Sequence, residues 1–448
     1  MTRHVIITLY LASLPVSAAV EQTPLQGSIT SIIEMQEKGK LVDARRACEA
    51  ALATAPNPST AAQERGMLLT TCGIISRQSG DLVKSLNLLE SAQSLWRTMF
   101  GPTAIQVGAT SLDLAVLHRL AGRYELSEQY ARTALDIYES GYGKNSLMVN
   151  NALITLSAAE ILNGRYADAE SNLKRVLALL KAASLESRDA AVVYYRLGQL
   201  YHRQGRYREA ERSHLRAAAL QGSGPDSARN LVALARVYHA TGRCSKAEAA
   251  CSRALDLLTG FLGPDHAEVV ATLQIFAQVR QSQKRYAEAA DLLNRALDSA
   301  VRSPVRDPGL ESTIRSNMGV SYFQEKRYGE AESQFRKALL IHESLGNDSR
   351  IALAAILHNL GLVCDKQGRR VEALDLASRA FALREADVPN ADSNLVEIML
   401  HKAELLRKAH RTGEAAKLEQ VARQAKAERS DGDQSRWMVD FRDLQNKR

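Results

Sequence analysis

The side chains that most often carry chemistry are sparse and scattered in this chain of 448 residues. The sequence has no phosphate-binding Gly-Lys-Ser/Thr loop, no Gly-x-Ser-x-Gly turn around a nucleophile and no His-Glu-x-x-His zinc motif. Its ten histidines are spread along the chain without metal-ligand spacing. The stretch Gly222-Ser223-Gly224 precedes Pro225, as a turn would. We therefore expect no catalytic residue, no metal site and no cofactor.

The cysteines leave two interpretations open. They are Cys48, Cys72, Cys244, Cys251 and Cys364. Cys244 and Cys251 lie seven residues apart on one predicted helix, about 10 Å by the helical rise, which is too far for a disulfide. Cys48 and Cys72 fall on helices that can be neighbours, so an oxidising compartment would allow them to bond. The simpler alternative treats all five as small buried side chains.

Any site must be positioned by a stretch that recurs ten times along the chain. Its clearest copy is Gln204-Gly205-Arg206-Tyr207-Arg208-Glu209-Ala210-Glu211. Aligned on the glycine, or on lysine at two places, the copies lie 37 to 45 residues apart and mostly 41 or 42. The aligned residues are Gly39, Gly80, Gly122, Gly164, Gly205, Gly242, Lys284, Lys326, Gly368 and Gly413. A period of this length indicates a repeat protein.

Each copy has the properties of a turn between two helices. The glycine suits a left-handed residue that ends one helix, and the tyrosine two residues later opens the next. Tyr328, Ala331, Phe335 and Ala338 then fall on one helix face. Upstream, Gly319 is spaced to let the preceding helix fit against that face. Each repeat is thus predicted to be a helical hairpin whose apolar side is buried by stacking on its neighbours.

The pattern resembles the tetratricopeptide repeat. The residues that carry the resemblance are the Leu-Gly-x-x-Tyr at 197–201, the Gly-x-Tyr-x-x-Ala at 205–210 and Ala217. Repeats of about 42 residues, rather than the basic 34, look like the long-repeat subclass found in kinesin light chains. The resemblance implies an all-α, right-handed superhelical solenoid of about ten antiparallel helical hairpins.

Three departures from the repeat pattern can be named. Ser85 and Ser127 replace the small alanine of the second helix, and the tenth repeat, built on Gly413, matches poorly. The step from Gly205 to Gly242 is only 37 residues, which predicts a shorter loop there.

Between repeats, Asp265 and Glu268 are spaced as a capping box at the start of a helix.

The resemblance also implies that the first helix of each repeat lines the inner face of the solenoid. By the family pattern the ligand-binding positions are Tyr195, Gln199, His202, Arg203, Arg229, Arg236, Gln274, Gln278, Asn317, His358 and Asn359, with Val232, His239, Gln281 and Ser316 beside them. Asparagine here resembles the groove asparagines that hold a peptide backbone by paired amide hydrogen bonds. Arginines beside them would favour carboxylates. The alternative is a solvated surface whose charges pair locally.

The start of the chain has the pattern of a secretory signal over residues 1–19. Arg3 precedes an apolar run, and small residues follow as far as Ala19. Cleavage after Ala18 or Ala19 would place the mature chain in the periplasm or outside the cell. The alternative is a misassigned start codon ahead of a cytoplasmic repeat protein.

The rest of the chain divides into three parts. Residues 20–27 form a short leader, residues 28–427 form the repeat array, and residues 428–448 form a linker and a short helix. Trp437, Phe441 and Leu444 share one face of that helix. It would cap the apolar edge of the last repeat or dock as a peptide elsewhere.

Composition narrows the class of partner. The 58 basic and 50 acidic residues are interspersed and give a net charge of +8, which weakly favours acidic partners. No basic run is interleaved with aromatic residues, so we expect no nucleic acid partner. Aromatic residues make up only 5% of the chain, which fits poorly with a large aromatic-lined substrate pocket. No later apolar stretch is long enough to cross a membrane.

The sequence therefore predicts a non-catalytic scaffold that binds a peptide or helical segment of a partner protein in its concave groove. Two alternatives stay open: a regulator or enzyme subunit whose groove binds a small ligand, and a structural assembly factor of the cell envelope. A closed pocket with converging polar groups would favour the small ligand. An open channel lined by rows of asparagine and arginine would favour the peptide.

Overall fold

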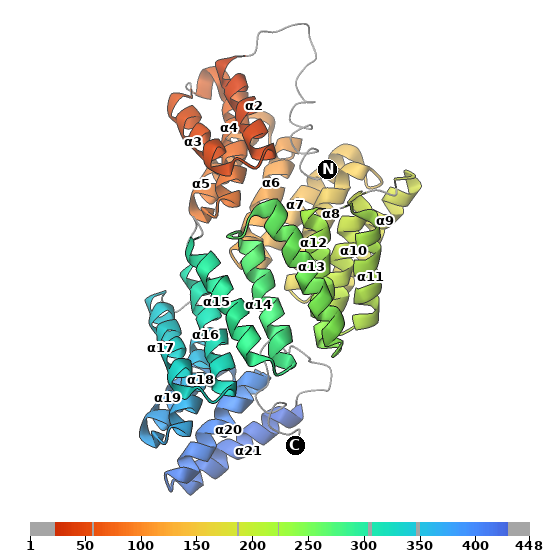
Figure 1. Cartoon of the computed structure of the whole chain (residues 1–448). Coiled ribbons are helices and arrows are strands. Elements are labelled where there is room, and N and C mark those ends of the chain that lie inside the picture. The colour runs from red at the N-terminus through yellow and green to blue at the C-terminus, as the bar shows by residue number, and fades with distance from the viewer. Residues whose placement is uncertain are drawn as a thin grey trace. The chain divides into compact units, whose positions relative to one another are not determined.

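The structure, a computed structural model, describes residues 23–55, 58–185, 188–222, 224–302, 307–345 and 350–428. Within these ranges it contains twenty α-helices and no strand (Figure 1). The signal predicted for residues 1–19 and the cap predicted beyond residue 428 lie outside the described residues.

The helices pair into ten antiparallel hairpins, and these group into two compact units. Unit 1 comprises α2 (Pro24–Glu37), α3 (Leu41–Thr54), α4 (Pro58–Gln78), α5 (Leu82–Phe100), α6 (Ile105–Leu120), α7 (Tyr124–Tyr142), α8 (Asn150–Leu162), α9 (Tyr166–Ala182), α10 (Arg188–Arg203) and α11 (Tyr207–Leu220). Unit 2 comprises α12 (Pro225–Ala240), α13 (Cys244–Leu262), α14 (Ala267–Ser282), α15 (Tyr286–Arg302), α16 (Pro308–Gln324), α17 (Tyr328–Ser344), α18 (Arg350–Lys366), α19 (Arg370–Arg384), α20 (Ser393–Lys408) and α21 (Thr412–Glu428).

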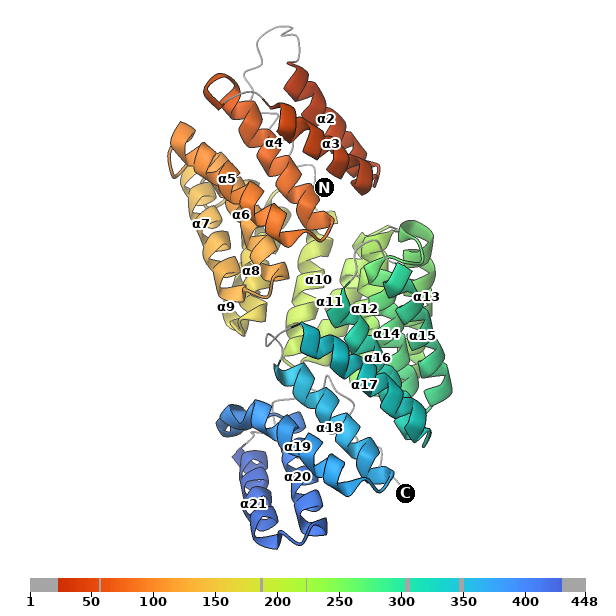
Figure 2. The ribbon, with the colours of Figure 1, turned by 90° about the vertical axis from the view of Figure 1, so that its left-hand side faces the viewer.

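Within each unit a hairpin packs against the next one along the chain. Figure 2 shows this for α18 to α21, which follow one another as two adjacent pairs. Short 3₁₀ turns at Leu147–Val149 and Glu385–Asn390 belong to the connections between hairpins. The structure thus confirms the predicted all-α solenoid of hairpins. Helix α2 begins at Pro24 and so includes residues that we assigned to a leader before the array.

The turns inside the hairpins have the predicted left-handed residue. Gly205 has φ +72°, and the lysines that replace glycine, Lys284 and Lys326, have φ of 61° and 62°. In the tenth hairpin this residue is His410, with φ 60°, so the predicted position at Gly413 was wrong. Gly413 is instead the second residue of α21. Measured to His410, the last step from Gly368 is 42 residues, as in the other regular repeats.

Close helix packing depends on small residues where the two helices of a hairpin meet. A Cβ at Gly319 on α16 would lie 2.7 Å from the ring of Phe335 on α17, whose side chain is fully buried. Ser85 and Ser127 are also fully buried. Their hydroxyls donate hydrogen bonds to the carbonyls of Gly73 and Ala115, at 2.8 and 2.7 Å. Serine can therefore replace alanine without leaving a buried polar group unpaired.

The step from Gly205 to Gly242 is only 37 residues long because a helix is shorter there, not because a loop is shorter. Helix α11 has 14 residues, whereas α13 has 19, and each is followed by a connection of four residues. The prediction of a shorter loop was therefore wrong. The predicted capping box also differs, because the side chain of His266 caps α14 by accepting from the amide of Glu268. Asp265 is ion-paired with Arg302 instead.

A disulfide joins Cys48 on α3 to Cys72 on α4, with 5.6 Å between the Cα atoms. It links the first hairpin to the second, and it is the pairing that the sequence allowed in an oxidising compartment. Cys251 and Cys364 are free and buried, as the alternative of small buried side chains predicts for them.

Candidate functional site

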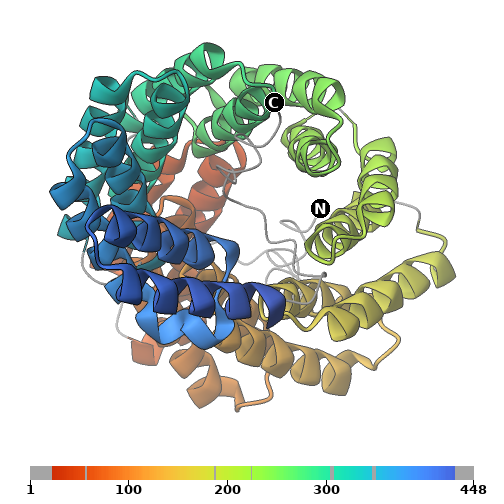
Figure 3. The same ribbon diagram turned by 90° about the horizontal axis from the view of Figure 1, so that it is seen from below.

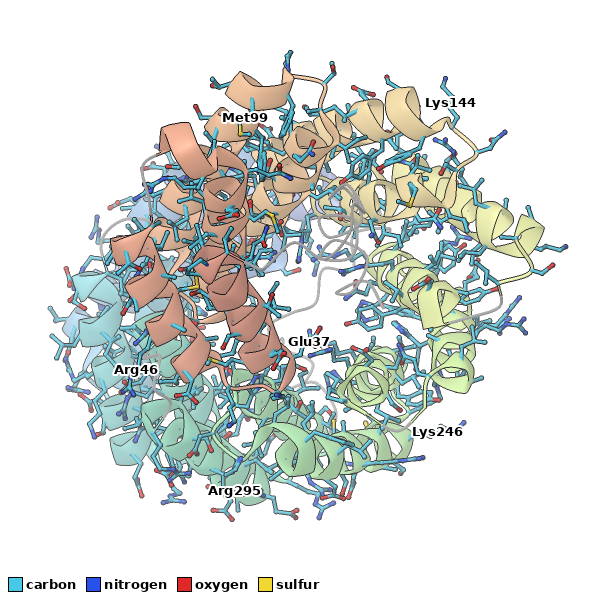
Figure 4. All side chains as sticks on the ribbon, turned by 90° about the horizontal axis from the view of Figure 1, so that it is seen from above. Glu37, Arg46, Met99, Lys144, Lys246 and Arg295 are labelled. Carbon is cyan, nitrogen blue, oxygen red and sulfur yellow. A yellow bond between two sulfur atoms is a disulfide. The ribbon has the colours of Figure 1, made fainter. Side chains whose placement is uncertain are left out.

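The candidate site is the inner side of each unit. Where the hairpins can be told apart in Figure 3, the first helix lies on the inner side of its unit and the second helix on the outer side. In unit 1, Arg46 on α3 and Lys144 after α7 lie on the outer side (Figure 4). Side chains on α4, α6, α8 and α10, and on α12, α14, α16 and α18, are therefore the ones that can meet a bound segment. All eleven predicted site residues lie on these helices.

Three of the predicted amides in unit 2 are half-buried at this surface. Gln274 and Gln278 lie one turn apart on α14, and Asn317 lies on α16. Within the described part of the chain their side chains make no hydrogen bond. Gln281, in contrast, is buried and donates to the backbone oxygen of Asn317 at 3.2 Å. It also donates to Ser321 at 2.9 Å, and so holds α14 against α16.

The predicted arginines of α12 differ in their surroundings. Arg229 donates from Nε and Nη2 to both carboxylate oxygens of Glu268, at 2.8 and 2.6 Å, and from Nη1 to Asp226 at 2.5 Å. Its hydrogen bond to Glu268 is the main reason why its pKa lies above the usual value. Arg229 therefore ties α12 to α14. Arg236 is half-buried on the same helix.

The structure buries the two predicted residues of α18, which we had placed on the groove surface. His358 exposes 3% and Asn359 exposes 9% of its surface. The ring of His358 packs edge-on against His401 of α20, with 5.1 Å between centroids. Burial lowers the pKa of His401 to about 4. His358 thus belongs to the packing between α18 and α20.

Two of the four predicted residues of α10 in unit 1, Tyr195 and Gln199, contact Arg196, an arginine that we did not single out. The ring of Tyr195 packs against His214 of α11, with 5.5 Å between centroids. Gln199 accepts a hydrogen bond from Nη1 of Arg196 at 2.9 Å. His202 is half-buried, whereas Arg203 is exposed and forms no ion pair with a described residue. Arg196 could have been found by aligning the first helices on their turn residues.

A hollow of about 630 Å³ lies against α7, on a second helix. It is lined by Glu125, Glu128, Gln129, Arg132, Thr133, Asp136, Asn163 and Arg165. Glu128 is buried and accepts from Arg132 at 2.7 Å and from Asn163 at 2.8 Å, and it is ion-paired with Arg165. These charges satisfy one another, so the hollow reflects a network that joins α7 to the α8–α9 turn.

The part of the chain that the structure describes contains neither a metal site nor a membrane-spanning helix. The described residues contain no group of three or more histidine, cysteine or acidic side chains placed to hold a metal ion. Among the same residues, no helix combines the length and the apolar character needed to cross a bilayer.

Comparisons with known proteins agree with the repeats seen here. The tetratricopeptide repeat family model matches residues 64–140, 148–222, 226–300 and 310–386. Protein KINESIN LIGHT CHAIN-RELATED 2 of Arabidopsis thaliana is 26% identical over 323 residues, which is 69% of this chain and 47% of that protein. KINESIN LIGHT CHAIN-RELATED 1 of the same plant is 24% identical over 307 residues, 67% of this chain and 50% of that protein. The chain thus spans about half the length of these curated relatives.

Two solved structures share the fold at low sequence identity. The apo form of the quorum sensor NprR from B. thuringiensis has a TM-score of 0.54 and 14% identity, covering 80% of this chain and 98% of that one. The apo form of RapI has a TM-score of 0.53 and 14% identity, covering 72% and 98%. With four matched segments that span most of the array, the chain belongs to the tetratricopeptide repeat family, and its long repeats are similar to those of kinesin light chain-related proteins.

Proposed function

We propose that this protein is a non-catalytic scaffold that holds an extended or helical segment of a partner protein against the inner side of its first helices. The observation that carries the proposal is the set of half-buried amides on α14 and α16. Gln274, Gln278 and Asn317 have no hydrogen-bond partner among the described residues, so their donors and acceptors remain available.

An amide side chain suits a peptide backbone because it offers both a donor and an acceptor. A peptide held in this way satisfies its own N–H and C=O groups while its side chains remain free to decide specificity. Gln274 and Gln278, one turn apart, would follow the segment along α14, and Asn317 would contact it from the neighbouring hairpin. The net charge of +8 and the exposed Arg203 favour an acidic segment.

The small-ligand alternative has less support. A site for a small molecule is usually a concave, mostly apolar pocket with a few converging polar groups. The hollow against α7 is lined instead by charged, amide and hydroxyl side chains, and its buried carboxylate is already paired. The alternative of an envelope assembly factor would need contacts between copies of the chain.

We also propose that the chain is exported and works in an oxidising compartment. The apolar run behind Arg3 supports this, and so does the disulfide between Cys48 and Cys72, because disulfides persist mainly outside the reducing cytosol. Mass spectrometry of the protein from fractionated cells checks it. Export predicts a chain that lacks residues 1–18 or 1–19, outside the cytoplasm and with this disulfide intact. A full-length reduced chain in the cytosol would refute it.

The scaffold proposal is tested by capturing partners from native extracts on three versions of the chain. The first is the wild type, and the second carries Gln274→Ala, Gln278→Ala and Asn317→Ala. The third carries Asn294→Ala and Gln420→Ala, which remove exposed amides from the second helices α15 and α21. Circular dichroism confirms that all three are folded. The affinity of each captured protein is then measured with purified components.

A groove-bound partner is retained by the wild type and by the outer-face control, and it is lost or weakened at least tenfold by the inner-face variant. Equal retention by all three versions would mean that the first helices of unit 2 do not form the binding surface. If self-association accounts for everything retained, the assembly-factor alternative replaces the scaffold.

A further inference from the structure

Two buried histidines meet at the junction between the ninth and the tenth hairpin. His401 of α20 exposes 7% of its surface, and its ring lies edge-on to that of His358 on α18, with 5.1 Å between centroids. Neither ring nitrogen of His401 has a hydrogen-bond partner among the described residues. A polar group that is buried without a hydrogen bond costs free energy. His401 is therefore a weak point in an otherwise apolar junction.

Three helices enclose the ring of His401. A Cβ on Gly361 of α18 would lie 3.6 Å both from Cε1 of His401 and from Cβ of Leu376 on α19. Leu357 of α18, Leu376 and Leu405 of α20 belong to the apolar core at this place. A protonated imidazole here would be a buried charge without water or a hydrogen bond, which a protein interior strongly disfavours. The closed junction thus requires a neutral His401.

The charged groups of the surrounding helices leave His401 without an acidic partner. Those that act on it from α18 and α20 are Asp365, Lys366, Glu404 and Lys408. Nζ of Lys408 lies 2.7 Å from Asp365 and 2.9 Å from Glu404, so both carboxylates already share a cation. On α19 and α21, the following charged residues are ion-paired elsewhere: Glu372, Arg379, Arg384, Glu414, Glu419 and Arg423. The remaining ones are exposed: Arg370, Asp375, Lys417 and Lys426.

The state of His401 is linked to the state of the junction. Burial is the main reason why its pKa falls to about 4, and the charges of Asp365 and Glu404 oppose this only in part. In the open junction the imidazole regains its ordinary pKa of 6.5. Between these two values the open state binds the proton more readily than the closed state. The stability of the junction is therefore fully present above about pH 6.5 and is lost as the pH falls towards 4.

We propose that His401, packed against His358, makes the tenth hairpin an acid-sensitive clasp, which is closed on α18 and α19 near neutral pH and opens in an acidic medium. Opening uncovers the apolar side of α18 and α19 against which Ile398 and Leu405 of α20 pack. A newly exposed apolar surface favours association with another one. The clasp goes beyond the proposed groove, because its residues lie between hairpins and not on the inner side.

Other buried groups titrate over the same range of pH. Burial raises the pKa of Asp113 to about 6 and lowers that of His118, both on α6. It also lowers the pKa of His239 on α12. A measurement on the whole chain would add these contributions together, so the readout has to resolve single helices.

Amide hydrogen exchange of the full chain, read by mass spectrometry of its peptides, gives that resolution. Exchange is measured at pH 7, 6 and 5, and each rate is compared with that of an unfolded peptide at the same pH to give a protection factor. The test variant is His401→Gln, which stays neutral throughout. The control is His410→Asn, which removes an exposed imidazole from the turn of the same hairpin. Asparagine tolerates the left-handed backbone at that position.

In the wild type and in the control, the protection factors of α20 and α21 should fall about twentyfold between pH 7 and pH 5. This value follows from linkage for one group with a pKa of 6.5 in the open state and about 4 in the closed state. In His401→Gln the same protection factors should stay nearly constant. An equal fall in His401→Gln, or no fall in the wild type, would overturn the clasp. An equal fall in every helix would overturn it too, since that is general acid denaturation.

A second variant, His401→Leu, keeps the test informative if glutamine is poorly tolerated in the core. Ile275 of α14 lies nine residues before the turn residue Lys284, just as His401 lies nine before His410, and it is buried. An aliphatic side chain therefore fits this position of the repeat. His401→Leu should remain closed from pH 7 to pH 5, and a loss of protection equal to that of the wild type would refute the role of His401.

Discussion

The carboxylate of Asp113 on α6 accepts a hydrogen bond from the guanidinium of Arg77 on α4, with 3.2 Å between Oδ1 and Nη2. The two side chains expose only 5% and 13% of their surface. Oδ2 of Asp113 and Nε of Arg77 have no hydrogen-bond partner among the described residues. Burial raises the pKa of Asp113 to about 6, and the positive charge of Arg77 only partly offsets this.

This shift predicts a dependence of stability on pH. The folded chain holds the proton of Asp113 more tightly than the unfolded chain, in which the pKa is near 3.8. The free energy of unfolding should therefore fall as the pH rises from about 4 to about 6, by about 3 kcal/mol from this group. Urea denaturation at several pH values, for the wild type and Asp113→Asn, measures it. The variant should lose that part of the pH dependence, and an unchanged dependence would show that Asp113 ionises normally.

Gly319→Ala should destabilise the hairpin of α16 and α17. The new methyl group would meet the ring of Phe335 at 2.7 Å, and overpacking of this kind costs about 1–3 kcal/mol. Chemical denaturation checks the loss. The control is Gly329→Ala on α17, where a methyl group meets no atom within 4 Å and should cost nothing. Equal stability of Gly319→Ala and the wild type would mean that the two helices move apart easily at this point.

Replacing Lys326 by glycine should stabilise the protein, because its φ of 62° is unfavourable for any residue with a Cβ. The gain is at most about 1 kcal/mol, since glycine also costs more backbone entropy on folding. His410→Gly should act in the same direction in the tenth hairpin. Gly205→Ala, at φ +72°, is the opposite change and should destabilise. Melting temperatures of the three variants decide whether the left-handed turns are strained.

Breaking the disulfide should loosen the first two hairpins and leave the others unchanged. The bond between Cys48 and Cys72 closes a loop over a sequence separation of 24 residues, and such a bond typically contributes about 2–4 kcal/mol. In the double variant Cys48→Ala and Cys72→Ala, backbone amide hydrogens of α2 to α4 should exchange faster than in the wild type. Reductant should reproduce this in the wild type and have no effect on the double variant. Unchanged exchange in these helices would show that packing alone holds the terminal hairpin.

The fold could be predicted from the sequence because its determinants are local and repeat ten times. A glycine or lysine at the turn, and a small residue where two helices cross, recur with a near-constant period. The errors occurred where one copy deviates. The left-handed turn residue of the tenth repeat is His410, and the sequence pattern pointed instead to the nearby Gly413, because glycine is the usual residue at such a position. The shortened repeat lost its five residues from α11, and a period alone cannot show which element is shorter.

The candidate site was less predictable because burial and ion pairing depend on neighbours in space. The sequence places His358 and Arg229 on inner helices, but it cannot show that His401 covers the first or that Glu268 binds the second. Arg196 was missed although it is visible in the sequence.

Substitution of Arg229 and of Arg203 should distinguish an arginine that stabilises the fold from one that binds the partner. Arg229 is held by Glu268 and Asp226, and both of its ion pairs are partly exposed, so Arg229→Ala should cost about 0.5–1 kcal/mol of stability. Arg203 is exposed and without an ion pair among the described residues, so Arg203→Ala should leave the melting temperature unchanged. Binding of a fluorescein-labelled deca-glutamate peptide to the full chain, measured by anisotropy, should weaken for Arg203→Ala and stay the same for Arg229→Ala. Weaker binding by Arg229→Ala at unchanged stability would contradict this. It would mean that the guanidinium of Arg229 leaves Glu268 and binds the acidic ligand directly.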